Sequence, residues 1–113
     1  MIVDSSALLA IILREPGHDR YLDAILNADN RRMSVANWLE ASMVVDARGN
    51  QAAAGYCQEF VRLGEIVLEP VSLTQGELAR DAWKAYGRGN HGARLNFGDC
   101  FAYALAKERG EPL

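Results

Sequence analysis

The sequence contains few of the residues that cross-link small domains or bind soft metals. Its only two cysteines, Cys57 and Cys100, have no Cys-x-x-Cys spacing and no histidine close by. This arrangement predicts neither a disulfide framework nor a zinc site, and it is typical of a protein in a reducing compartment. Only 3 of the 113 residues are proline, and the chain has no repeats or low-complexity tracts. A collagen-like or disordered chain is therefore excluded.

Long hydrophobic runs and an excess of basic charge are also missing. The apolar run from Ala7 to Leu13 is far shorter than the roughly 20 residues of a membrane-spanning helix, and no basic segment precedes it as in a signal peptide. We therefore expect a cytoplasmic protein with no membrane partner. The chain has 12 Lys and Arg against 15 Asp and Glu, a net charge of -3, so any contact with a polyanion must be local.

The residues that are present describe one globular domain. Hydrophobic residues make up 50% of the chain and charged residues 24%, as in an ordinary soluble fold. A chain of this size buries about two-thirds of the surface that its unfolded form exposes, so one core forms without metal or disulfide. We predict a single domain over residues 1–113 and exclude two stacked domains.

Short apolar and β-branched runs alternate with segments of helical periodicity. Strands are predicted at residues 1–3, 32–35 and 66–68. Helices are predicted at residues 7–14, 18–28, 36–48, 51–63 and 98–109, and another opens at a capping-box spacing over residues 74–77 and ends at Gly87. Because helices rather than tight turns separate the strands, we expect parallel pairing in an α/β fold, a three-layer α/β/α sandwich with a short sheet.

The first candidate functional residue is Asp4, which follows the first predicted strand. In an open α/β sheet, ligands bind at the carboxyl ends of the strands. The alternative is that Asp4 only caps the next helix, although Ser5 and Ser6 are also able to take that role.

The second candidate is Glu40, which lies at helical spacing from Ala36, Met43, Val44 and Ala47. This pattern places its carboxylate within or beside an apolar stripe. Because burying an unpaired carboxylate costs several kcal/mol, such groups are paired, protonated or metal-bound. The alternatives are a salt bridge to an Arg or Lys, or a side chain that reaches the edge of the stripe.

The third candidate is Asp99, which comes three residues after Asn96 at the start of the last predicted helix. The spacing is that of a capping box, with an acid in the first turn. Gly98, a poor helix former, allows a ligand or a backbone segment to approach closely.

These three acids are far apart in the sequence and meet only through the fold. Carboxylates held close together repel one another, and a divalent cation removes that conflict. Oxygen ligands without His or Cys favour Mg²⁺ or Mn²⁺ over zinc. Such a site is typical of phosphodiester hydrolysis.

Three segments carry a resemblance to a known family. The opening residues 1–9, the segment 37–42 and above all residues 95–104, with the sequence Leu-Asn-Phe-Gly-Asp-Cys-Phe-Ala-Tyr-Ala, resemble the PIN-domain ribonucleases, and among them the VapC toxins of bacterial toxin-antitoxin pairs. The resemblance covers essentially the whole chain. It implies a PIN-like fold and an endoribonuclease that depends on Mg²⁺, which Mn²⁺ can replace.

The resemblance also implies roles for individual residues. Asp4, Glu40 and Asp99 form the catalytic and metal-binding set: Asp4 and Asp99 hold the metal directly or through water, and Glu40 orients or deprotonates the attacking water. Ser6 matches the hydroxyl residue that supports the first acid. We also expect Ser6 and Asn96 to contact the substrate.

The glycine-rich stretch between Gly87 and Gly98 contains Arg88, His91 and Arg94. We expect Arg88 and Arg94 to contact RNA phosphates. The alternative is a solvated loop whose basic residues only aid solubility.

The family resemblance implies an RNA substrate, a cognate VapB-type antitoxin, and a homodimer. In the family, a further acid follows a strand after the last helix. The sequence ends at Leu113, before such a segment, so we expect the last strand and this fourth acid to be missing. Two alternatives stay open: a catalytically silent PIN-like module that binds RNA or protein, and a different Mg²⁺-dependent phosphohydrolase, which the lack of a P-loop or Asp-x-Asp pattern disfavours.

Overall fold

The computed structural model describes residues 1–87 and 95–113 of the chain. Its elements follow the order α1 (Ser5–Ile12), α2 (His18–Asn27), β1 (Arg32–Ser34), α3 (Val35–Ala47), α4 (Gln51–Leu63), β2 (Val67–Glu69), α5 (Leu73–Tyr86) and α6 (Phe97–Arg109). Each helix expected from the periodicity is present, with ends within a few residues of the predicted ones.

The sheet is short and parallel, as predicted. Strands β1 and β2 pair in parallel with Met33 opposite Leu68. The predicted strand at residues 1–3 lies on the other side of β1, but it forms only one parallel bridge, between Ile2 and Arg32, and is not a full strand. The backbone N–H of Ile2 also donates to the Pro112 carbonyl, at 2.7 Å, so the residues after α6 run along the outer side of this segment.

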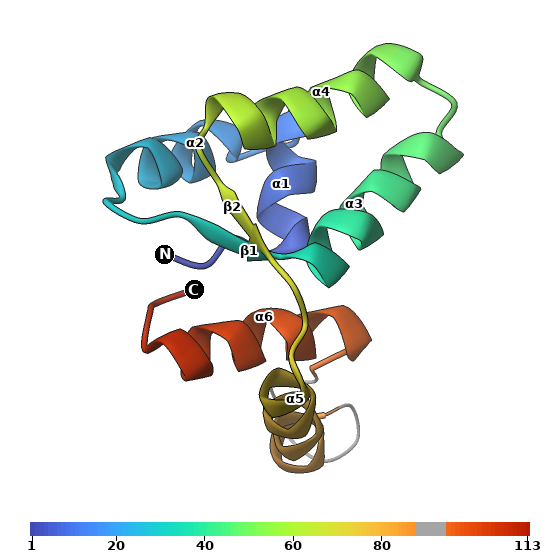
Figure 1. Ribbon diagram of the computed structural model, residues 1–113. Coiled ribbons are helices and arrows are strands. Elements are labelled where there is room, and N and C mark those ends of the chain that lie inside the picture. Colours follow the sequence, from blue (N-terminus) through green and yellow to red (C-terminus); the bar gives the residue numbers. More distant parts are fainter. Residues whose placement is uncertain (88–94) are drawn as a thin grey trace.

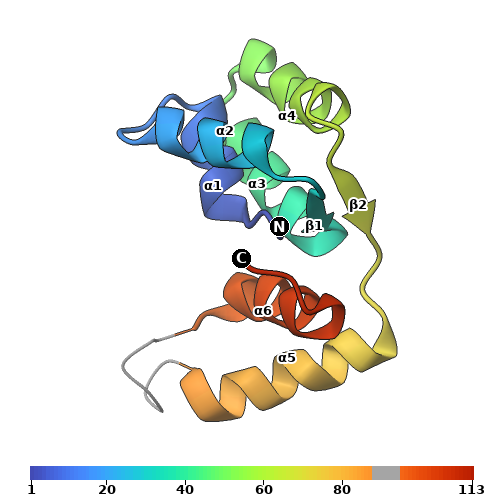
Figure 2. The same cartoon turned by 90° about the vertical axis from the view of Figure 1, so that its left-hand side faces the viewer.

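The strands lie between two groups of helices, as Figure 1 shows: α1 to α4 on one side, and α5 and α6 on the other. Helix α5 packs against α6, and α6 contacts β1. Figure 2 shows the two chain ends close together beside α6. This arrangement confirms the predicted layered α/β fold.

The alternation of Ile2 and Val3 explains how the layers are joined. Successive residues of an extended segment point to opposite faces. Val3 packs into the larger apolar cluster beneath α1 to α4, whereas Ile2 packs against Ala102 and Leu105 of α6. Both residues are about 2% exposed. Among the described residues, no helix has both the length and the apolar character needed to cross a membrane.

Four helices begin one or two residues earlier than predicted, and α5 and α1 show the reason. Helix α5 does not open at Thr74 with a capping box, because Ser72 is its N-cap and accepts a hydrogen bond from the Gln75 N–H at 3.1 Å. Helix α1 begins at Ser5, two residues earlier than predicted, because Asp4 acts as its N-cap. In both cases an oxygen-bearing side chain just upstream satisfies the first free N–H groups of the helix.

A network of ion pairs ties the C-terminal residues to the strands. Arg32 lies 2.8 Å from Glu69 and 3.0 Å from Glu111, Arg109 lies 3.0 Å from Glu69, and the Met1 ammonium lies 2.9 Å from Glu111. Hydrogen bonds from the Met1 ammonium, and then from Arg32, lower the pKa of Glu111 below its ordinary value. These contacts hold the end of the chain beside β1.

Candidate active site

Asp4 lies where residues 1–3 end and α1 begins. Its Oδ1 accepts hydrogen bonds from the Ala7 N–H at 2.9 Å and from the Ser6 hydroxyl at 2.8 Å. The sequence offered Ser5 and Ser6 as alternative caps, but the cap is Asp4 itself. Asp4 therefore both follows the extended residues 1–3 and caps α1, so the two alternatives are compatible. The Ser6 hydroxyl binds the Asp4 carboxylate directly.

Asp99 and Asn96 form the predicted capping box at the start of α6. Asn96 Oδ1 accepts from the Asp99 N–H at 2.9 Å, and Asp99 Oδ2 accepts from the Asn96 N–H at 3.0 Å. Asp4 and Asp99 therefore both lie at helix N-termini, where the backbone dipoles favour negative charge. Each carboxylate keeps one oxygen that has no hydrogen bond from the described residues.

Glu40 lies in the middle of α3, and of the alternatives left open for it the structure shows the side chain that reaches the edge of the apolar stripe, not the salt bridge. The side chain is exposed rather than buried, and its partner is not an Arg or Lys but the Ser5 hydroxyl, which donates a hydrogen bond to Oε1. The carboxylate also lies against the first turn of α6, since a Cβ added at Gly98 would come within 2.5 Å of both Glu40 oxygens. A close approach was predicted at Gly98, but the group that approaches is the Glu40 side chain rather than a ligand or a backbone segment.

Sequence reasoning assigned no role to Asn37, and it considered Ser5 only as a possible helix cap. Asn37 is only 1% exposed, and its Nδ2 donates to the Gly98 carbonyl at 2.8 Å and to the Ser5 hydroxyl at 3.2 Å. A signal was available, because Asn37 is spaced four residues before Ala41 and eight before Val45, the other buried residues of α3. An amide on that buried face needs polar partners.

The three acid-bearing segments thus meet at one place. Ser5, next to Asp4, and Gly98, next to Asp99, both contact Glu40. Within the described part of the chain, however, no three acidic, histidine or cysteine side chains gather closely enough to hold a metal ion by themselves. None of the three acids is in an ion pair with a described basic residue.

The predicted RNA contacts Arg88 and Arg94, together with His91, lie outside the described residues. The residues that flank this stretch are held side by side, because the Leu95 N–H donates to the Tyr86 carbonyl at 2.8 Å. Asn96, which follows directly, is exposed.

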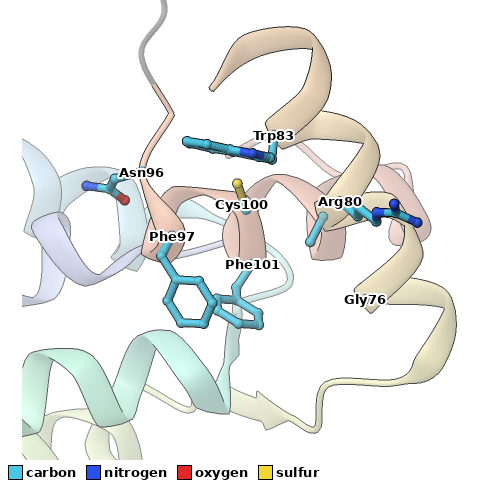
Figure 3. A pocket seen from close by; sticks show the side chains of 8 residues that line it. Gly76, Arg80, Trp83, Asn96, Phe97, Cys100 and Phe101 are labelled. Carbon is cyan, nitrogen blue, oxygen red and sulfur yellow. The ribbon is translucent and has the colours of Figure 1, made fainter. Parts of the chain in front are cut away.

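Two apolar hollows adjoin the site. The smaller, of about 390 Å³, is lined by Glu40 and Gly98 together with apolar side chains that include Leu39 and Met43. The larger, of about 640 Å³, lies between α5 and α6, and Figure 3 shows Trp83 of α5 facing Cys100 of α6 across it. Phe97 and Phe101 line both hollows. Their rings pack edge to face with centroids 4.8 Å apart, and Phe97 is 79% exposed.

The model of the family described as "PIN domain" matches residues 1–113. This chain belongs to the PIN-domain family. Its relatives within that family carry the VapC name. It is 46% identical to "Ribonuclease VapC28" of Mycobacterium tuberculosis, over 100% of this chain and 86% of the relative. It is 38% identical to "Ribonuclease VapC" of Mycolicibacterium smegmatis, over 100% of this chain and 88% of the relative.

A solved structure shows the same fold. The PIN domain described here superposes on VapC20 of Mycobacterium tuberculosis, a "Sarcin-Ricin loop cleaving toxin", with a TM-score of 0.75 over 97% of this chain and 83% of that one. The sequence identity is 17%, so this likeness concerns the fold alone. The family resemblance read from residues 1–9, 37–42 and 95–104 is confirmed.

Proposed function

We propose that this protein is the toxin of a type II toxin-antitoxin pair and that it cleaves RNA as a Mg²⁺-dependent endoribonuclease. The observation that carries the proposal is that Glu40 contacts Ser5 and Gly98, the sequence neighbours of Asp4 and Asp99, while none of the three acids has a basic partner among the described residues. The relatives that match the whole chain are named as ribonucleases, which supports the same reaction for this chain.

The donor chemistry of the site fits Mg²⁺ or Mn²⁺. All the candidate ligands are carboxylate oxygens, which are hard donors. The lack of a cluster of three ligands agrees with the way Mg²⁺ is usually bound, through one or two carboxylates and several waters. Asp4 and Asp99 would hold the ion, directly or through water. When bound, it would polarise the scissile phosphate and offset negative charge in the transition state.

The protein's own side chains supply the remaining steps. Glu40 orients the attacking water and accepts its proton, as an exposed carboxylate beside an open hollow is able to do. Ser6 holds the Asp4 carboxylate through its hydroxyl. Attack by water at phosphorus, with the 3′ oxygen leaving, yields a 5′-phosphate and a 3′-hydroxyl.

Substrate contacts are assigned to Ser6, Asn96, Arg88 and Arg94. Ser6 and Asn96 are exposed beside Asp4 and Asp99 respectively. The two arginines would neutralise phosphates of the RNA backbone, a local contact that is compatible with the net charge of -3.

The partners in this proposal are a VapB-type antitoxin and a second copy of the chain. Helix α2 exposes Tyr21 and Leu26, which suits an antitoxin segment that covers the first two helices. Leu39, Met43 and Phe97 form an exposed apolar surface on α3 and α6, which suits a homodimer contact. Isolated monomers rarely expose large contiguous apolar patches.

The test is cleavage of a single-stranded RNA by purified protein with Mg²⁺, with Mn²⁺ and with EDTA. We expect cleavage with either ion, none with EDTA, and a rate at least about 100-fold lower for Asp4→Ala, because that variant loses a carboxylate that would hold the metal ion. Unchanged cleavage by Asp4→Ala would contradict the site assignment. RNA binding without cleavage by the unaltered protein would instead identify a silent binding module.

A further inference from the structure

Asn37 occupies the centre of the junction between the three acid-bearing helices. It belongs to α3, about one turn before Glu40, and its side chain is almost completely buried, at 1% exposure. The two hydrogens of its amide group go to two different helices: one to the carbonyl of Gly98 at the start of α6, the other to the hydroxyl of Ser5 at the start of α1. One side chain therefore fixes the relative placement of α1, α3 and α6.

The direction of these hydrogen bonds is determined by their acceptors. A backbone carbonyl only accepts, so the amide nitrogen, and not the amide oxygen, must face Gly98. The Ser5 hydroxyl donates its one hydrogen to Glu40, so toward Asn37 it acts as the acceptor. The bonds run from Asn37 to Ser5 and from Ser5 to Glu40, and each polarises the next.

A buried amide is not the arrangement that stability alone favours here. The amide oxygen, Oδ1 of Asn37, is buried and has no hydrogen-bond partner among the described residues. An unsatisfied buried acceptor destabilises a fold, whereas an apolar side chain of similar size at the same place avoids that cost. Only the two N–H groups of the Asn37 amide contribute hydrogen bonds to the site.

The position of Glu40 depends on the same contacts. Its carboxylate lies so close to Gly98 that a methyl group there would overlap both oxygens, and the Gly98 backbone is what Asn37 holds at 2.8 Å. Ser5 and Gly98 thus restrain Glu40 from two sides, and Asn37 binds both of them.

We propose that Asn37 is a positioning residue: it binds Ser5 and Gly98 so that the Glu40 carboxylate is held at the N-terminus of α6, against these two neighbours of Asp4 and Asp99 in the sequence. Asn37 itself touches no substrate and acts through Glu40. The inference deepens the proposed ribonuclease function and rests on it for the effect on rate, but the placement of Glu40 is measurable in the protein without metal or RNA.

The test compares Asn37→Leu with unaltered protein, because leucine is similar in size and donates no hydrogen bond. Two readouts are used. The first is the carboxyl carbon NMR signal of Glu40 in metal-free protein labelled at glutamate, assigned by its loss in Glu40→Gln. The second is the cleavage rate at saturating RNA with Mg²⁺, measured in the native background and in the Glu40→Gln background.

We expect Asn37→Leu to move the Glu40 signal toward that of freely exposed glutamates. We expect it to lower kcat by about tenfold or more with little change in KM, since misplacing a reacting group acts on the chemical step. In the Glu40→Gln background the same substitution should leave the residual rate within about twofold, because the group it positions is already gone. Gln58→Leu, an exposed amide on α4, is the matched control and should alter neither readout.

Two results would overturn the proposal: an unmoved Glu40 signal in Asn37→Leu, or an equal loss of rate with and without Glu40. If Asn37→Leu does not fold, Ser5→Ala removes the middle of the chain of hydrogen bonds and should move the Glu40 signal in the same way. An unmoved signal in folded Ser5→Ala would then reject the proposal. If the unaltered protein does not cleave RNA, the proposed function fails, yet the NMR signal still decides the role of Asn37.

Discussion

Glu69 and Glu111 lie within ion-pair distance of basic groups, whereas Asp4, Glu40 and Asp99 accept hydrogen bonds only from hydroxyl and backbone N–H groups. The first pair stabilises the end of the chain against β1. The second set leaves its negative charge uncompensated by the described residues, although the helix N-termini at α1 and α6 reduce the cost.

Under the proposed function, this difference separates the acids that stabilise the fold from the acids that take part in the reaction. Carboxylates paired with arginine have no need of an added cation. Carboxylates brought near one another without a base repel, and a divalent ion relieves that repulsion. The net negative charge of the chain therefore includes a local excess at these three acids, which a bound divalent cation would neutralise.

The largest expected difference between the two regions is in activity. Asp99→Asn should lower the rate of Mg²⁺-dependent RNA cleavage at least about 100-fold, because it removes the charge but keeps an oxygen for the capping box. Glu69→Gln should leave the rate unchanged. Initial rates of RNA cleavage by the two variants are measured under the same conditions. Similar rates for Asp99→Asn and Glu69→Gln would contradict the distinction between the two groups of acids.

A second prediction concerns Gly98. A methyl group at this position displaces the Glu40 carboxylate, and the end of that flexible side chain can move without unfolding the protein. We expect Gly98→Ala to lower kcat by about tenfold to 100-fold, while thermal stability stays equal or rises, because alanine favours helix over glycine by roughly 0.5–1 kcal/mol.

The control for that variant is Gly55→Ala in α4, where an added Cβ meets nothing within 4 Å. It should raise stability without changing kcat. If Gly98→Ala keeps full activity, the close packing of Glu40 on α6 has no bearing on the reaction.

The smallest expected effect concerns Glu111 and is one of stability alone. Its pKa is lowered in the folded protein, chiefly by the Met1 ammonium and then by Arg32, from an ordinary value of 4.5. A lowered folded pKa means that the ion pairs stabilise the fold above about pH 4.5 and lose their effect as the pH falls through the folded pKa.

Glu111→Gln should therefore lower the Tm by a few degrees at neutral pH, with RNA cleavage unchanged. The difference in Tm from the unaltered protein should shrink as the pH falls below 4.5. Thermal unfolding followed by circular dichroism across this range measures it. A difference that grows toward acid pH would have the wrong sign for this network.

Much of the fold follows from local sequence signals. The periodicity of residues 36–48 predicted α3, the spacing of Asn96 and Asp99 predicted a capping box, and the absence of tight turns between strands predicted parallel pairing; all three agree with the structure. Each of these features depends on residues close together in the sequence or on a general rule of chain connection.

The features that were not predicted depend on contacts between distant segments. Nothing local to Ser5 indicates that its hydroxyl faces α3, and the buried position of Asn37 is meaningful only once α1 and α6 are packed on either side. For Glu40 the helical pattern left open whether its carboxylate lies within the apolar stripe, paired with a base or a metal, or reaches the edge of the stripe. The true position is exposed, where a hydroxyl is sufficient.

Under the proposed function, Asp4, Glu40 and Asp99 form the site of a divalent cation, whereas the ion-paired Glu69 and Glu111 do not bind one. Calorimetric titration of Mn²⁺ into the RNA-free protein tests it most directly. We expect saturable binding of Mn²⁺ by the unaltered protein and by the double variant Glu69→Gln, Glu111→Gln. We expect no binding by the double variant Asp4→Asn, Asp99→Asn. Binding that is retained when Asp4 and Asp99 are replaced would contradict it.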